Sequence, residues 1–175
     1  DAAVLLGVNI LKSLILYVKI FFSSAESVIP GMTLDDLWLH SSGTGHLAKE
    51  IMAAEGAGKR VQDEALVAGM MHDVGKLLVM EVPGYIPRIL PEMQKGKTFV
   101  EAEYARFSTS HAEIGGYLLG IWGLPDTLVE AVTCHHSPRQ IPQSECSILT
   151  AVHVANALLA VPPNDSSFLD RAYLN

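Results

Sequence analysis

Apolar residues recur every three to four positions along most of the chain, which is the spacing of one buried helix face. The clearest case is the segment from Ala2 to Phe22, whose apolar face is formed by Val4, Leu5, Val8, Leu11, Ile15, Val18 and Phe22. No segment of useful length alternates apolar and polar residues as a half-buried strand does. The pattern therefore predicts an all-α fold, a single compact multi-helix bundle.

Caps and breaks divide the rest of the chain into shorter helices. Thr33 is placed to cap a helix that begins at residue 34, and Ser110 with Glu113 has the spacing of a capping box. The prolines within 83–91 predict a short, broken stretch. The expected helices cover residues 34–55, 62–80, 99–107, 110 to about 123, 125 to about 136, and 144–160.

Composition narrows the classes of protein to consider. The chain has 175 residues, 49% of them hydrophobic and 18% charged, so it can bury a real core and is not a disordered chain. The formal net charge is −7 and no basic cluster is present. Because phosphate backbones are bound by clustered Lys and Arg, we expect no nucleic-acid partner.

The apolar segment at residues 2–22 resembles a membrane span but contains Lys12 and Lys19. A lysine near the bilayer centre costs about 2.5–3.5 kcal/mol, so two of them favour a core helix and no membrane association. No signal-peptide cleavage pattern follows the segment. Cys134 and Cys146 form no CxxC pair, which is typical of reduced thiols, and we expect a cytoplasmic protein.

The dyad His72-Asp73 is the first candidate for chemistry, because a neighbouring imidazole and carboxylate offer nitrogen and oxygen donors to a divalent cation. Lys76 lies four residues after His72. On a continuing helix the two residues share a face, where Lys76 would meet a phosphate oxygen.

Four further histidines lie within or at the ends of predicted helices, and histidines on facing helices of a bundle can converge on one metal site. The candidate metal ligands are His40, His72, Asp73, His111, His135 and His136. Taken singly, each has a simpler interpretation: a histidine at a helix C-terminus complements the helix dipole, and His111 merely opens a helix. We interpret His46 as ordinary and His153 as a core or surface residue.

The segments 37–41, 68–77, 111–115 and 122–138 together resemble the HDOD family, over roughly Ala2 to Ala160. The resemblance implies a helical output module of bacterial signalling proteins, in the wider HD superfamily of metal-dependent phosphohydrolases that includes the HD-GYP phosphodiesterases. It also implies that most members lack a demonstrated activity and many have lost the metal ligands.

The resemblance also implies roles for single residues. His40 matches the first HD-type metal ligand, and His72 with Asp73 matches the dyad. Lys76 matches the lysine that follows the dyad in HD-GYP enzymes. The histidines that match the ligands of a second metal are His111, His135 and His136. In an active enzyme Asp73 and Lys76 would be the catalytic residues, as proton acceptor and phosphate contact.

Two departures from the HD pattern argue against catalysis. Asn156 stands near the position of the closing aspartate, and the Gly-Tyr-Pro motif is absent from 137–142. Asp73 would then be the one negative ligand, which is too little charge for two divalent cations. The site suits a single divalent metal, and zinc, nickel, iron or manganese fits it better than magnesium.

Two hypotheses follow. The first is a non-catalytic signalling module that relays an input by binding a partner protein or a nucleotide; the second is a metal-dependent phosphohydrolase acting on nucleotides or cyclic dinucleotides. Because the chain begins with Asp1 rather than Met, we expect residues 1–175 to be the C-terminal part of an HDOD-like domain whose N-terminal portion is missing. A receiver or other signalling domain is expected in the same parent chain.

Overall fold

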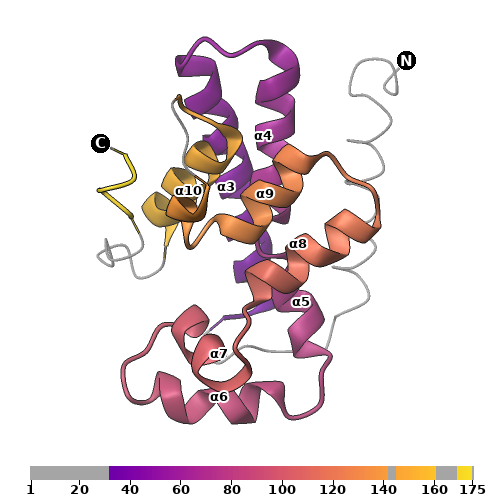
Figure 1. Ribbon diagram of the computed structural model, residues 1–175, viewed down its shortest axis with the longest axis vertical. Coiled ribbons are helices and arrows are strands. Elements are labelled where there is room, and N and C mark those ends of the chain that lie inside the picture. The colour runs from indigo at the N-terminus through magenta and orange to yellow at the C-terminus, as the bar shows by residue number, and fades with distance from the viewer. Residues whose placement is uncertain (1–31, 142–144, 161–168, 175) are drawn as a thin grey trace.

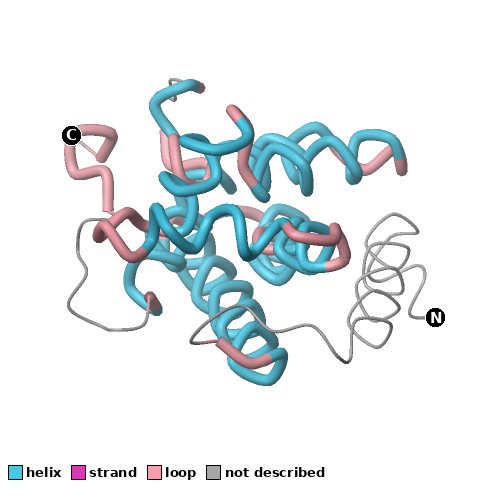
Figure 2. Tube along the Cα trace, turned by 90° about the horizontal axis from the view of Figure 1, so that it is seen from below, coloured by secondary structure: helices cyan, strands magenta, loops and turns pink. Residues whose placement is uncertain are grey.

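The computed structural model describes residues 32–141, 145–160 and 169–174, and within these ranges every regular element is a helix (Figures 1 and 2). The elements are α3 (Leu34–Ala54), α4 (Lys59–Met71), α5 (Val74–Met80), α6 (Tyr85–Met93), α7 (Phe99–Phe107), α8 (His111–Ile121), α9 (Asp126–Cys134), the 3-10 helix η1 (Pro138–Gln140) and α10 (Ile148–Leu159). The all-α prediction is confirmed. The core helix predicted over 2–22 lies outside the described residues.

The caps read from the sequence define where the helices begin. Thr33 and Ser110 each accept a hydrogen bond from the backbone of the first turn, in capping boxes that start α3 and α8. Thr98 starts α7 with the same device, which the sequence analysis did not identify. The cap at Ser110 makes His111 the first residue of its helix, and this determines where the imidazole can reach.

The single helix predicted over residues 62–80 is wrong. The chain forms α4 and α5 instead, and the break falls on the dyad: His72 ends α4 and Asp73, at φ −100° and ψ 11°, precedes α5. Successive residues of a continuous helix point about 100° apart. The break lets both side chains of the dyad approach one point, with His72 Nε2 3.4 Å from Asp73 Oδ2.

The main core is formed by α3, α4, α9 and α10, which pack against one another. The approach of α3 to α4 depends on Gly45 and Gly69, since a Cβ on Gly69 would lie 2.6 Å from the Cα of Gly45. This contact brings the helix that carries His40 alongside the helix that ends at His72.

The second, smaller apolar cluster lies where α6 and α7 pack together at one end of the molecule (Figure 1). It is joined to the main bundle through α5, which packs against α8. Within the described residues, no helix is both long enough and apolar enough to cross a membrane.

Candidate metal centre

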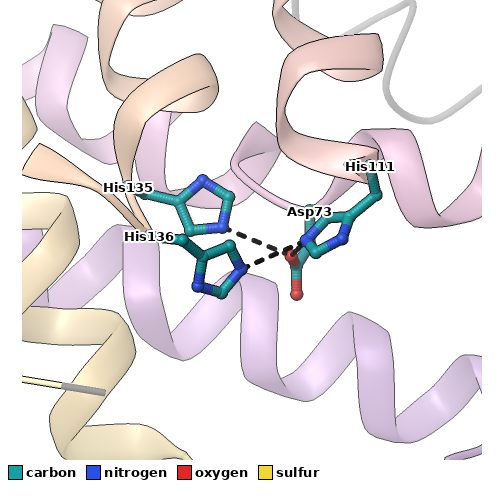
Figure 3. Close-up of side chains that lie close together, drawn as sticks. All are labelled: Asp73, His111, His135 and His136. Atoms are coloured by element: carbon teal, nitrogen blue, oxygen red, sulfur yellow. Dashed lines mark hydrogen bonds and ion pairs between the residues drawn. The ribbon is translucent and has the colours of Figure 1, made fainter. Parts of the chain in front are cut away.

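Asp73 lies at the centre of a buried cluster of histidines and is itself 2% exposed. Its Oδ1 is 3.1 Å from Nε2 of His111 and 3.7 Å from Nε2 of His135. Figure 3 shows these two rings and that of His136 converging on the carboxylate from α8 and from the end of α9. Its position makes Asp73 the residue that joins these elements.

The other oxygen of Asp73 faces a different set of groups. Lys76 Nζ donates to Oδ2 at 2.6 Å, and Nε2 of His40 lies 3.9 Å away. Burial by itself would raise the pKa of Asp73, but the nearby His72 and Lys76 outweigh it and hold this pKa well below its usual value. Asp73 is therefore a carboxylate, and Lys76 contacts it rather than sharing a helix face with His72 as predicted.

The tautomers of two imidazoles follow from their hydrogen bonds. His72 Nδ1–H donates to the carbonyl of Gly69 at 2.6 Å, and His135 Nδ1–H donates to the carbonyl of Val132 at 2.7 Å. In a neutral ring the proton on Nδ1 leaves a lone pair on Nε2. Metal-bound histidines are held in the same way, through backbone carbonyls or carboxylates.

Glu103, on α7, orients the ring of His111 and was missed by the sequence analysis. It is fully buried, and its Oε2 accepts hydrogen bonds from His111 Nδ1 at 2.6 Å and from the His111 backbone at 3.0 Å. Its Oε1 accepts a hydrogen bond from the hydroxyl of Tyr85 at 2.9 Å. The only signal in the sequence was a glutamate on the apolar side of a helix.

Burial and neighbouring charge set the protonation of the remaining histidines. Burial, reinforced by His136, holds the pKa of His135 well below 6.5, and burial with His111 does the same for the pKa of His136. For His111 burial also acts to lower the pKa, but the adjacent carboxylates of Asp73 and Glu103 outweigh burial and raise this pKa. Burial lowers the pKa of His40 to about 4. Neutral imidazoles are the form that binds metals.

Three buried polar atoms of the cluster have no hydrogen-bond partner: His72 Nε2, Asp73 Oδ1 and His135 Nε2. Buried polar atoms are nearly always paired, so unpaired ones require an explanation such as an ion. One ligand atom from each of four residues lies within 4.8 Å of the others, and these residues are Asp73, His111, His135 and His136. The donor set and the unpaired atoms both fit a divalent transition metal.

A second set of potential ligand atoms comes from His40, His72 and Asp73. Asn156 affects whether His40 can serve as a ligand in this set, because His40 Nε2–H donates to the amide oxygen of Asn156 at 2.9 Å. In that tautomer Nε2 of His40 has no free lone pair for a metal. The closing position of the HD pattern thus holds the first histidine by a hydrogen bond and adds no negative charge.

The structure brings all six predicted ligands together, and their role as ligands stays a prediction. His46 lies outside the cluster and donates to the Ser42 carbonyl, in line with the ordinary role expected for it. His153 is a core residue, 1% exposed. His135 does lie at the end of α9 and donates to a carbonyl of the last turn, but its lowered pKa leaves the ring uncharged, and its Nε2 faces Asp73.

Comparison with known proteins identifies the family to which this bundle and its histidine cluster belong. The HDOD domain model matches residues 1–138, well over half of the chain. The chain therefore belongs to the HDOD family, as its motifs indicated.

Solved structures share the fold. An HDOD domain protein of unknown function from Geobacter sulfurreducens is 28% identical, with a TM-score of 0.69 over 89% of this chain and 52% of its own. A protein from Shewanella amazonensis SB2B described as a candidate phosphohydrolase is 22% identical, with a TM-score of 0.70 over 91% of this chain and 57% of its own. At that identity the second likeness concerns the fold alone.

A curated relative from Treponema pallidum (strain Nichols), an uncharacterized protein, is 25% identical over 129 residues. The match covers 69% of this chain and 24% of the relative. The chain thus spans about a quarter of that relative and a little over half of each solved structure.

Proposed function

We propose that this HDOD domain binds one divalent transition metal in the buried cluster and serves as a non-catalytic output module in bacterial signal transduction. The observation that carries the proposal is the convergence of ligand atoms from three histidines on Asp73, with two atoms of this set, Asp73 Oδ1 and His135 Nε2, buried and unpaired. Asp73, His111, His135 and His136 would hold the metal.

The charges around the cluster favour one metal over two. Asp73 is ionised, and Glu103 adds a second buried carboxylate through its hydrogen bond to His111. With Lys76 counted, one divalent cation beside these two carboxylates would leave one net positive charge, whereas two cations would leave three. Three imidazoles and one carboxylate suit zinc, iron, nickel or manganese better than magnesium.

The bond between His40 and Asn156 supports a non-catalytic role, because it leaves the second ligand set without a closing carboxylate. The centre would then stabilise a defined arrangement of α5, α8 and α9. A signal from another domain of a cytoplasmic parent protein would be relayed by binding a partner protein or a nucleotide.

The test of metal binding is elemental analysis of protein purified without chelator, compared with His72→Ala and Asp73→Asn variants. We expect about one transition metal per wild-type chain, and none in Asp73→Asn, since that change removes the one carboxylate of the four-residue set. A wild-type protein that carries no metal, and takes up none when zinc, iron, nickel or manganese is added, would overturn the proposal.

Lys76 supports a second candidate function, that of a metal-dependent phosphohydrolase. Its side chain is 12% exposed and its Nζ contacts Asp73, so it could neutralise a phosphate oxygen at the edge of the cluster. When bound, a divalent metal supplies Lewis acidity and lowers the pKa of water. Asp73 would accept the proton that this water gives up.

Hydrolysis of nucleotides and cyclic dinucleotides by the metal-loaded protein decides between the two candidates. For an enzyme, we expect turnover that falls about a hundredfold or more in Lys76→Ala, which loses the phosphate contact. Metal-loaded protein that is inert toward these substrates with manganese and with iron excludes this candidate and leaves the first in place.

A further inference from the structure

His153, on α10, links the candidate metal centre to the C-terminal end of the chain. Its Nδ1–H donates to the carbonyl of His135 at 2.8 Å, and its Nε2 accepts from the backbone N–H of Asp170 at 2.9 Å. Because one nitrogen donates and the other accepts, the ring is held as a single neutral tautomer. The side chain is 1% exposed, so the link is buried.

The segment 169–174, named here the C-terminal turn, is held by further contacts. The carboxylate of Asp170 accepts from Arg139 of η1 and, at 3.2 Å, from the backbone N–H of Tyr173. The hydroxyl of Tyr173 lies 2.9 Å from Oγ1 of Thr150, and the Tyr173 ring packs edge-on against His153. The turn is thus attached to both α10 and η1.

The position of these contacts along the chain matters for the centre. His135 is the C-cap of α9, where a backbone carbonyl lacks a partner within the helix, and His153 supplies that partner. Arg139 follows His136 by three residues. The backbone from His135 to Arg139 is therefore connected to the C-terminal turn at two points, at the His135 carbonyl through His153 and at the Arg139 side chain.

We propose that His153 is a positioning residue for the metal centre and that docking of the C-terminal turn is coupled to metal binding. The inference rests on the proposed metal-binding function and extends it to residues beyond the 1–138 match to the family model. Coupling is reciprocal: if the docked turn strengthens metal binding, the bound metal stabilises the docked turn by the same factor.

The experiment measures metal affinity by competition with a chromophoric zinc chelator, and hydrogen exchange of the Asp170 amide with and without zinc. The variants are His153→Phe, which keeps a ring of similar size, and the charge reversals Arg139→Glu and Asp170→Arg, alone and combined. Reversal of the pair Arg60–Glu64, in which the arginine is exposed and the glutamate largely buried and which lies toward the start of α4, is the matched control.

We expect His153→Phe to weaken zinc binding about tenfold, as loss of an outer contact to a metal-bound histidine does. Each single charge reversal should weaken it about threefold, and the double reversal should restore it, because the ion pair forms again with opposite polarity. Zinc should slow exchange of the Asp170 amide in the wild type. The Arg60–Glu64 reversal should change neither readout.

Wild-type protein that binds zinc, while the Arg139 and Asp170 reversals bind it equally well and zinc leaves Asp170 exchange unchanged, overturns the inference and leaves the proposed function standing. Wild-type protein that binds no zinc, iron, nickel or manganese overturns both. If His153→Phe does not fold, the reversals and their rescue by the double variant still decide the question.

Discussion

Glu103 shows how much of the centre depends on a single side chain outside the ligand set. It is fully buried and holds His111 by both the ring and the backbone. The carboxylate accepts a hydrogen bond from Nδ1 of His111 and so fixes the ring with Nε2 facing Asp73 Oδ1 at 3.1 Å. The pair of helices α6 and α7 contains no histidine or aspartate, yet it contributes to the site through Glu103.

The change Glu103→Gln tests this role. We expect it to weaken metal affinity about tenfold, because an amide of the same shape is a neutral partner for the His111 ring. Affinity can be measured by competition with a zinc chelator, and Glu50→Gln, an exposed residue of α3, is the control. Equal affinities of Glu103→Gln and wild type would show that Glu103 contributes only to packing.

At the scale of elements, the contact between α5 and α8 holds two parts of the centre in place. A Cβ on Gly75 would collide with the backbone carbonyl of His111 and reach the backbone of Gly115 at 3.0 Å. Gly75 follows Asp73 by two residues, and His111 opens α8. The close approach of the two backbones therefore sets the spacing between Asp73 and His111.

The change Gly75→Ala should lower the free energy of unfolding by about 2–3 kcal/mol, because the added methyl must separate two packed backbones. The matched control is Gly120→Ala, also on α8, where a Cβ meets no atom within 4 Å and should stabilise the helix by about 0.5–1 kcal/mol. Chemical denaturation of the chelator-treated protein measures both. A Gly75→Ala protein as stable as wild type would contradict the packing argument.

At the scale of the whole molecule, the buried histidines make the stability of the metal-free protein depend on pH. The pKa of His40 is lowered to about 4, and those of His135 and His136 are held well below 6.5. The unfolded chain therefore binds more protons than the folded chain below about pH 6.5. His111 acts in the opposite direction, because its pKa is raised.

The free energy of unfolding of chelator-treated protein should fall as the pH is lowered from about 6.5 to 4, by about 3 kcal/mol on account of His40 alone. Denaturant unfolding at a series of pH values measures the effect. His40→Gln should flatten the profile, whereas His46→Gln, at an exposed position, should leave it unchanged. A stability that is constant between pH 6.5 and 4 would exclude buried, neutral histidines.

Local features of the sequence predicted most of the helices and the six candidate ligands that the structure brings together. The caps at Thr33 and Ser110 act on backbone groups within three residues, so they can be read directly from the sequence. The six candidate ligands are of residue types that need a partner when buried, and their places at helix ends or within amphipathic helices indicated convergence. The segments 37–41, 68–77, 111–115 and 122–138, taken together, were also sufficient to indicate the HDOD family.

The break at the dyad and the environment of each ring were decided by tertiary contacts. His40 contacts Asn156, which lies 116 positions away along the chain. His153 contacts both Asp170 and the carbonyl of His135, so three separate segments of the chain meet at this ring. Burial of Glu103 follows from the packing of α7 and not from its own neighbours in the chain. Sequence by itself determined most of the helices and which residues are available for chemistry, because those depend mainly on nearby positions. Only the packed bundle decided which side chains meet, because such contacts join residues far apart in the chain.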